Sequence, residues 1–200
     1  MDKITDIATL EAIYGDAVPR SIDKVLTRIS PAYARWIEAS RFVILSTVGP
    51  EGTDASPRGD DGPVVRIADA QTVLLPDWMG NNRIDSLRNV VRDPRMSLMF
   101  MVPGSTNVVR INGAGAVSAD PALLASFEKK GRQPRTVLRV TVEEIYFQCA
   151  KALMRSRLWA GIEDAPNVPS AGDFVREVDE GFDGASYDAG YPDYAKERLW

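Results

Sequence analysis

The feature of this sequence that most constrains its fold is a long central region in which strand-like segments outnumber helical ones. Between residues 42 and 147, runs rich in Val, Ile, Leu and Phe alternate with turns rich in Gly, Pro and Asp, a pattern typical of β-strands. The expected strands cover 42–48, 64–67, 72–75, 95–102, 107–118 and 136–147. Helices are expected only at 82–92 and 121–129, too few for a parallel sheet. The sequence predicts a mainly β protein with peripheral helices, folded as an antiparallel Greek-key barrel.

Short helices are expected on both sides of this barrel. Apolar residues recur at helical spacing over residues 5–39, and Pro19 and Pro31 suit helix starts. We interpret this stretch as helices that pack on the barrel, and expect another helix over residues 150–159. The chain then divides into a helical extension (1–41), a barrel domain (42–162) and a C-terminal arm (163–200).

The C-terminal arm allows two interpretations. It is acidic and rich in Gly and Pro, a composition that alone suggests a disordered tail. It also carries Phe174, Phe182, Tyr187, Tyr191 and Tyr194, which are too apolar for a purely solvated segment. We therefore expect the arm to pack on the barrel or on a partner subunit.

Composition excludes several classes of function. The 200 residues carry a formal net charge of -4, so no overall positive field favours nucleic acid or an anionic membrane. Cys149 is the single cysteine; it is expected to be buried, and the chain to be cytoplasmic. No apolar run is long enough to span a membrane, and the N-terminus does not resemble a secretory signal. With no histidine, histidine-based nucleophilic catalysis is impossible, a metal site is not expected, and an enzyme would depend on a bound cofactor.

Two segments carry residues suited to an anionic ligand. In an extended run, Ser56 and Arg58 point to one side, and Gly59 lets a ligand approach the backbone; an ordinary polar turn is the alternative. The second segment, 76–83, ends a strand and opens a helix. Its candidate binding residues are Asp77, Asn81, Asn82 and Arg83. Asn81 or Asn82 is expected to cap the helix, and Arg83 in the first turn suits a bound phosphate better than an empty helix start.

Two later segments add polar groups beside small or aromatic residues. Alternation over 107–117 places Arg110 and Asn112 on one strand face with alanines, which leaves room for a flat ligand, although a solvated face is the alternative. Lys151, Arg155 and Trp159 are spaced to form one basic stripe on a helix, which could equally be solvated.

In order along the chain, these pieces resemble one family. The resemblance covers about residues 42–159 and rests on Leu45–Gly52, Ser56–Asp60, Leu75–Asp77, Gly80–Asn89, Pro103–Gly104, Arg110–Gly113, Cys149–Ala152, Arg155–Ser156 and Leu158–Trp159. The chain is similar to the pyridoxamine 5'-phosphate oxidase-like FMN-binding split-barrel superfamily, and more narrowly to its branch of FMN-dependent enzymes.

That resemblance implies a split β-barrel, a homodimer and FMN bound between the subunits. The phosphate would contact Ser56, Arg58 and the turn at residues 81–83, with Arg110 and Asn112 near the flavin. Lys151, Arg155, Ser156 and Trp159 would approach from the same or the partner subunit. It implies an FMN-dependent oxidoreductase with a small-molecule redox substrate such as NAD(P)H; a non-catalytic module that stores FMN or another cofactor is the alternative. The absence of histidine argues against oxidation of pyridoxamine phosphate itself.

Overall fold

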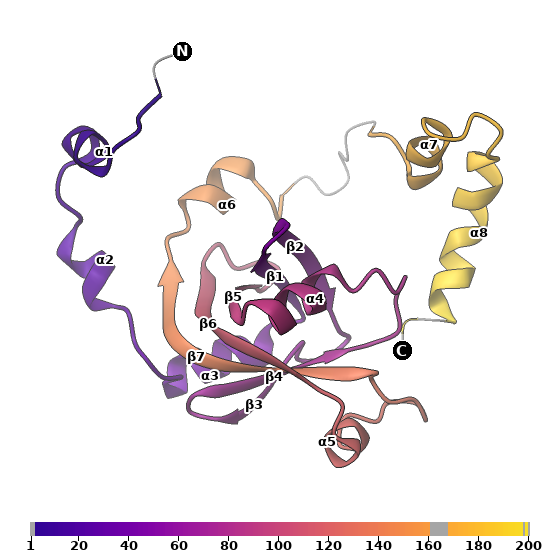
Figure 1. Ribbon diagram of the computed structural model, residues 1–200, viewed down its shortest axis with the longest axis horizontal. Coiled ribbons are helices and arrows are strands. Elements are labelled where there is room, and N and C mark those ends of the chain that lie inside the picture. Colours follow the sequence, from indigo (N-terminus) through magenta and orange to yellow (C-terminus); the bar gives the residue numbers. More distant parts are fainter. Residues whose placement is uncertain (1–2, 161–167, 198, 200) are drawn as a thin grey trace.

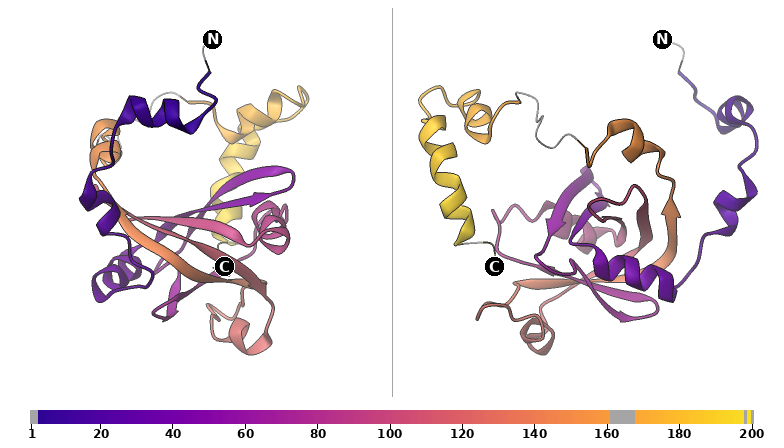
Figure 2. Two further views of the ribbon diagram at one scale, coloured as in Figure 1. Left: turned by 60° about the vertical axis from the view of Figure 1, so that its left-hand side comes forward. Right: turned by 180° about the vertical axis from the view of Figure 1, so that it is seen from behind.

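The computed structural model describes residues 3–160, 168–197 and 199, and these contain one antiparallel sheet (Figure 1). Its order is β2-β1-β5-β6-β7-β4-β3, and every neighbouring pair is antiparallel. The strands are β1 (Phe42–Gly49), β2 (Gly52–Gly59), β3 (Arg66–Asp69), β4 (Thr72–Asp77), β5 (Arg95–Met101), β6 (Val108–Ser118) and β7 (Thr136–Gln148). The sheet curls without closing (Figure 2). The prediction of a split antiparallel barrel with peripheral helices is confirmed.

Alternation along each strand builds the core on the concave side of this sheet. Leu98, Phe100, Ile111, Leu138 and Ile145 are fully buried, and each comes from a strand in the middle of the order. The helix α3 (Pro31–Ala39) adds its buried Ile37, and α4 (Asp85–Arg92) adds Val90. These apolar contacts hold the two helices against the barrel.

A glycine on the inner face of β6 lets α4 approach the sheet. A Cβ atom built on Gly115 would lie 2.6 Å from Sδ of Met96 and 3.0 Å from Cγ1 of Val90. Both distances are below ordinary van der Waals contact. The absence of a side chain at residue 115 therefore sets how close α4 lies to the sheet.

The N-terminal extension does not pack as the periodicity suggested. Of its helices, only α3 buries residues; α1 (Ile7–Tyr14) and α2 (Pro19–Asp23) bury none and extend away from the barrel (Figure 1). The start of α1 carries a local cap, since Oδ1 of Asp6 accepts from the amide of Thr9 at 2.8 Å. Helical spacing thus reports a local preference, and the interpretation of α1 and α2 as packing helices is wrong for this single chain.

The described part of the C-terminal arm folds into a helical pair, α7 (Ala171–Arg176) and α8 (Gly184–Lys196). They meet at Gly172 and Gly184, where a Cβ on Gly172 would lie 2.4 Å from the carbonyl oxygen of Gly184. Nη1 of Arg132, in the loop before β7, donates to the carbonyl oxygen of Glu197 at 3.0 Å. The expected boundary between residues 162 and 163 lies outside the described residues, and packing of this arm on a partner stays a prediction.

Several expected boundaries move. The strand expected over 64–67 begins two residues further along the chain, as β3. The helix expected over 121–129 is shorter, as α5 (Pro121–Ala125). The final predicted helix also ends early, as α6 (Lys151–Ser156), because Arg157 adopts a left-handed conformation with φ of 50°. In the described parts of the chain, no helix combines the length and apolar character needed to cross a membrane.

Candidate functional site

A cavity of about 490 Å³ lies where β2, the end of β4 and α4 meet. Four of its described lining residues are arginines and one is acidic: Arg58, Arg88, Arg92, Arg135 and Asp77. Leu87, Val91 and Val117 form an apolar part of the wall. In a chain whose net charge is -4, this excess of cations favours an anionic ligand with an apolar portion.

Among the cations that line this cavity, Arg58 is the one that the sequence predicted. It comes from the edge strand β2 and forms an ion pair with Asp77 at the end of β4; their side chains are 25% and 17% exposed. Nε of Arg58 and Oγ1 of Thr136 are buried without a hydrogen-bond partner among the described residues. Such groups are costly to leave unpaired, and both belong to residues that line the cavity.

The segment before α4 differs from its prediction. Asn82 and Ile84 are left-handed, with φ of 62° and 52°, so α4 begins only at Asp85 and its N-cap residue, Ile84, makes no side-chain capping bond. The prediction that Asn81 or Asn82 caps the helix is wrong, and Arg83 precedes the first turn instead of lying in it.

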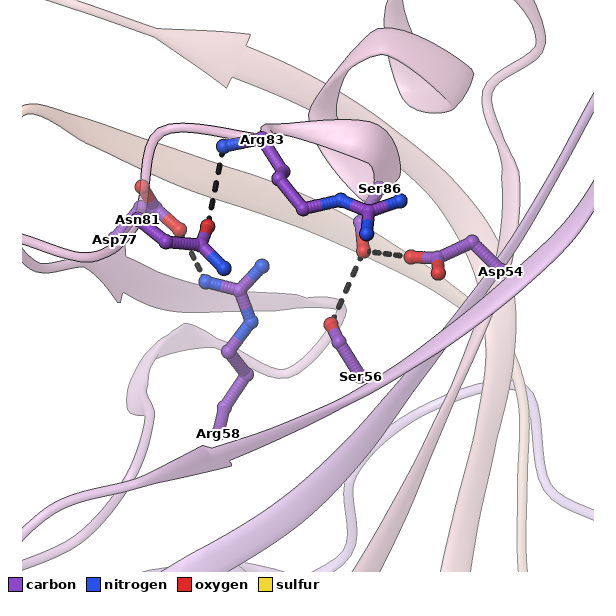
Figure 3. A network of polar contacts seen from close by, with 7 residues as sticks. All are labelled: Asp54, Ser56, Arg58, Asp77, Asn81, Arg83 and Ser86. Carbon is purple, nitrogen blue, oxygen red and sulfur yellow. Dashed lines mark hydrogen bonds and ion pairs between the residues drawn. The ribbon is translucent and has the colours of Figure 1, made fainter. Parts of the chain in front are cut away.

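Asn81, Asn82 and Arg83 instead hold the loop before α4 in place. Oδ1 of Asn81 accepts from the amide of Arg83 at 3.1 Å, and Oδ1 of Asn82 accepts from Nη1 of Arg135 at 2.7 Å. Nε of Arg83 donates to Oδ2 of Asp85 at 2.8 Å. These bonds give the loop over the cavity a fixed shape and keep Arg83 beside the start of α4 (Figure 3).

A second polar cluster joins β2 to α4 next to Arg58 (Figure 3). Asp54, Ser56 and Arg58 share one face of β2 because side chains alternate along a strand. Oγ of Ser56 lies 3.0 Å from Oγ of Ser86, and Ser86 donates to Oδ2 of Asp54. Sequence reasoning missed Asp54 and Ser86, although two-residue spacing from Ser56 was a usable signal for Asp54.

The other lining cations were also missed. Arg88 and Arg92 are separated by one helical turn, a spacing that follows from the helix already expected there. Arg135 and Thr136 reach the cavity because β7 pairs with β4, with Asp77 opposite Thr136. That contact depends on strand pairing, for which the sequence carried no local signal.

Of the predicted site residues, Arg58, Asp77, Asn81 and Asn82 line this cavity. Ser56 and Arg83 do not line it, and neither do the residues that remain. Nδ2 of Asn112 donates to Oε2 of Glu144 at 2.9 Å, and the Arg110 guanidinium lies 5.4 Å from the centre of the Tyr146 ring. Both contacts join β6, which carries Arg110 and Asn112, to the neighbouring strand β7. Gly59 lies at the end of β2 near the carbonyl of Arg41.

The predicted basic stripe near residue 155 is interrupted. Lys151, Arg155 and Ser156 lie on α6, but the helix ends before Trp159, whose Nε1 instead donates to the carbonyl oxygen of Ser105 at 2.7 Å. The prediction that Trp159 continues the stripe is wrong because the chain reverses at Arg157. Cys149, expected to be buried, is exposed. Within the described residues, no cluster of three or more acidic or Cys side chains could hold a metal ion.

Comparison with known proteins gives the family. The family model described as pyridoxamine 5'-phosphate oxidase matches residues 29–149, more than half of the chain. Similar solved structures include HupZ from Group A Streptococcus, at 18% identity and a TM-score of 0.45, covering 56% of this chain and 90% of that one. A Clostridium acetobutylicum protein related to general stress protein 26 of B. subtilis (pyridoxinephosphate oxidase family) has 15% identity, a TM-score of 0.46 and coverages of 58% and 85%.

An F420 reductase has 14% identity, a TM-score of 0.44 and coverages of 60% and 98%. None of the curated proteins matches this chain. The family match begins two residues before α3, ends one residue after β7 and so takes in the whole sheet. The chain belongs to the pyridoxamine 5'-phosphate oxidase family.

Proposed function

We propose that this protein binds FMN at the arginine-lined cavity and acts as an FMN-dependent oxidoreductase. The observation that carries the proposal is the buried, unpartnered Nε of Arg58 in a wall that also holds Arg88, Arg92 and Arg135. FMN joins a dianionic phosphate to a polyol chain and a flat apolar ring. The cavity offers cations and an apolar wall side by side, and its volume lies in the range of about 300–1,000 Å³ common to cofactor and drug-sized sites.

In this proposal the phosphate binds on the side of Arg58 and Arg83, beside the start of α4. Charge-assisted hydrogen bonds to a phosphate contribute about 1.5–3 kcal/mol each. Arg88 lines the same cavity and is a further cation for the phosphate, because its guanidinium forms no ion pair or hydrogen bond with any other described residue. Two or three such bonds support micromolar or tighter binding after the entropy of association is subtracted.

The protein's own contribution to chemistry is positioning and electrostatics. FMN, when bound, supplies hydride transfer between a reduced donor such as NAD(P)H and an acceptor. The chain contains no histidine, so no imidazole is present for proton transfer near neutral pH. Leu87, Val91 and Val117 offer the flavin ring an apolar surface, and the arginines fix the orientation of the phosphate.

We also propose that the active form is a homodimer. Arg110, Asn112, Lys151 and Arg155 lie outside the cavity of their own chain, so a second copy is the natural source of their contacts with the flavin. Mixing R58Q and N112A protomers tests this. If each site draws on both copies, a mixed dimer regains one intact site, and flavin binding returns on mixing. If binding stays absent in mixed dimers, the two residues do not serve one shared site.

Absorbance spectroscopy and titration test the main proposal. Purified protein should show bound flavin or take up added FMN, and R58Q should weaken FMN binding by at least tenfold. Arg20→Gln, on α2 and away from the cavity, is the matched control and should bind normally. A wild-type protein that ignores FMN contradicts the proposal. Bound flavin that no reduced donor bleaches would instead favour the non-catalytic storage module.

A further inference from the structure

The hydroxyl groups of Ser56 and Ser86 form a chain whose direction is set by Asp54. An ionised carboxylate can only accept hydrogen bonds, so Ser86 must donate its single hydroxyl hydrogen to Oδ2 of Asp54. The contact of 3.0 Å between the two serine oxygens then requires Ser56 to donate to Ser86. All three residues are linked across the junction between β2 and α4 (Figure 3).

This direction limits what Ser56 can offer to a ligand. Its hydrogen is committed to Ser86, and among the described residues nothing donates to its oxygen. Ser86 is buried at 3% exposure, whereas Ser56 is only partly buried and shares one face of β2 with Arg58, which lines the cavity. Ser56 therefore presents hydrogen-bond acceptors. A phosphate dianion, which also only accepts, does not complement it.

We infer that Asp54 is a positioning residue that makes Ser56 the acceptor for a hydroxyl of the ligand's polyol chain, not a contact for its phosphate. The inference rests on the proposed binding of FMN. Ser56 and Arg58 are two residues apart on one strand face, about 6.6–6.8 Å by the rise of a strand. A polyol chain attached directly to a phosphate spans such a gap, with the phosphate at Arg58 and a hydroxyl donating to Ser56.

Charge supports the same orientation. The carboxylate of Asp54 lies at the Ser56 end of this face and repels a phosphate, while Arg58 lies at the other end and attracts it. The phosphate-facing and hydroxyl-facing groups are thus separated along β2. The arrangement selects ligands in which an anionic group and a hydrogen-bond donor are separated by about the rise of two strand residues.

Titrations of S56A with FMN and with riboflavin, which lacks the phosphate, test this assignment. We expect S56A to weaken both ligands by a similar factor of about five, the loss of one neutral hydrogen bond. R58Q should weaken FMN much more than riboflavin. The ³¹P resonance of bound FMN should be unchanged in S56A and shifted in R58Q. Ser21→Ala, on α2, is the control and should change neither affinity nor resonance.

The role of Asp54 is separated from a merely structural one by D54A and the double variant D54A/S56A. If Asp54 acts through Ser56, D54A lowers both affinities and the double variant binds no more weakly than S56A. Additive losses contradict the inference, as does an S56A variant that shifts the ³¹P resonance and weakens FMN alone. A wild-type protein that binds no flavin instead refutes the proposed function itself.

Discussion

The guanidinium of Arg58 and the carboxylate of Asp77 join two parts of the sheet that are far apart in strand order. Arg58 lies on β2, one end of the order, and Asp77 ends β4, next to the other end. A backbone bond also links the two ends of the order, because the amide of Val64, before β3, donates to the carbonyl oxygen of Ser40, before β1, at 2.9 Å. The split in the barrel is therefore bridged by a residue pair that also lines the candidate cofactor cavity.

Replacing Arg58 should reduce both stability and FMN binding. R58Q leaves Asp77, whose side chain is 17% exposed, without its cation. Removing one partner of a largely buried pair costs about 2 kcal/mol, which lowers the melting temperature by roughly 4–8 °C for a chain of this size. Differential scanning fluorimetry without flavin measures this loss separately from binding.

Asp77→Asn separates the two roles of Arg58. It removes the negative charge that competes with a phosphate for Arg58, so we expect FMN affinity to rise by a few-fold while stability falls. The double variant R58Q/D77N should recover part of the stability of R58Q and none of its FMN binding. A double variant that binds FMN as well as wild type would show that Arg58 acts only through the fold.

The barrel was predictable because buried strands carry their signal in their own residues. Val43 and Leu45 alternate with polar or half-buried positions along β1, and this two-residue period survives any change of neighbours. The edge strand β2 was recognised only as an extended run, since Asp54 and Pro57 disfavour strands. It forms because it is an edge, where Pro57, opposite Ile44, is tolerated.

The candidate site was predictable only in part, because its geometry depends on tertiary contacts. Ser56 and Arg58 share a face by strand alternation, which the sequence reveals. Arg135 reaches Asn82 because β7 pairs with β4, and the sequence does not reveal this pairing. Likewise, left-handed conformations at Asn82 and Ile84 delay the start of α4, although the residue types favoured an earlier start.

Acid should weaken the end of α4 through Asp93. Hydrogen bonds from the Arg95 side chain, and then from its backbone, lower the pKa of Asp93 from 3.8 to about 2. Because the folded-state pKa lies below the ordinary value, the contribution is complete above about pH 4 and is lost as the pH falls towards 2. Urea midpoints measured from pH 7 to pH 2 should therefore fall less steeply in D93N than in wild type.

The comparison needs a matched control because other carboxylates titrate in the same range. Asp23→Asn, on the exposed helix α2, should keep the full acid sensitivity of wild type. If D93N and wild type lose stability in parallel below pH 4, the Asp93–Arg95 contact contributes nothing to folding.

Lys129 should hold the loop between β6 and β7 against the barrel. Its Nζ lies 2.5 Å from Oδ1 of Asp60, whose side chain is 8% exposed, and it also pairs with Asp61. The contact with Lys129 lowers the pKa of Asp61. K129M leaves the buried Asp60 carboxylate without this cation, which costs about 2 kcal/mol, and should speed proteolytic cleavage within residues 126–135. Lys3→Met is the control and should be cut at the wild-type rate; equal rates in K129M would contradict the role of Lys129.

Three glycine-to-alanine variants should rank by what the added methyl group meets. At Gly113 the Cβ would lie 1.9 Å from the carbonyl oxygen of Thr141, a backbone atom that cannot yield without breaking the pairing of β6 and β7. At Gly115 it meets the flexible Met96 side chain at 2.6 Å, and at Gly62 it meets nothing within 4 Å. Overpacking typically costs about 1–3 kcal/mol; we expect G115A within this range, G113A above it and G62A near zero. Chemical unfolding gives the order directly, and a G113A protein as stable as G62A would show that β6 and β7 are farther apart at residue 113 than described.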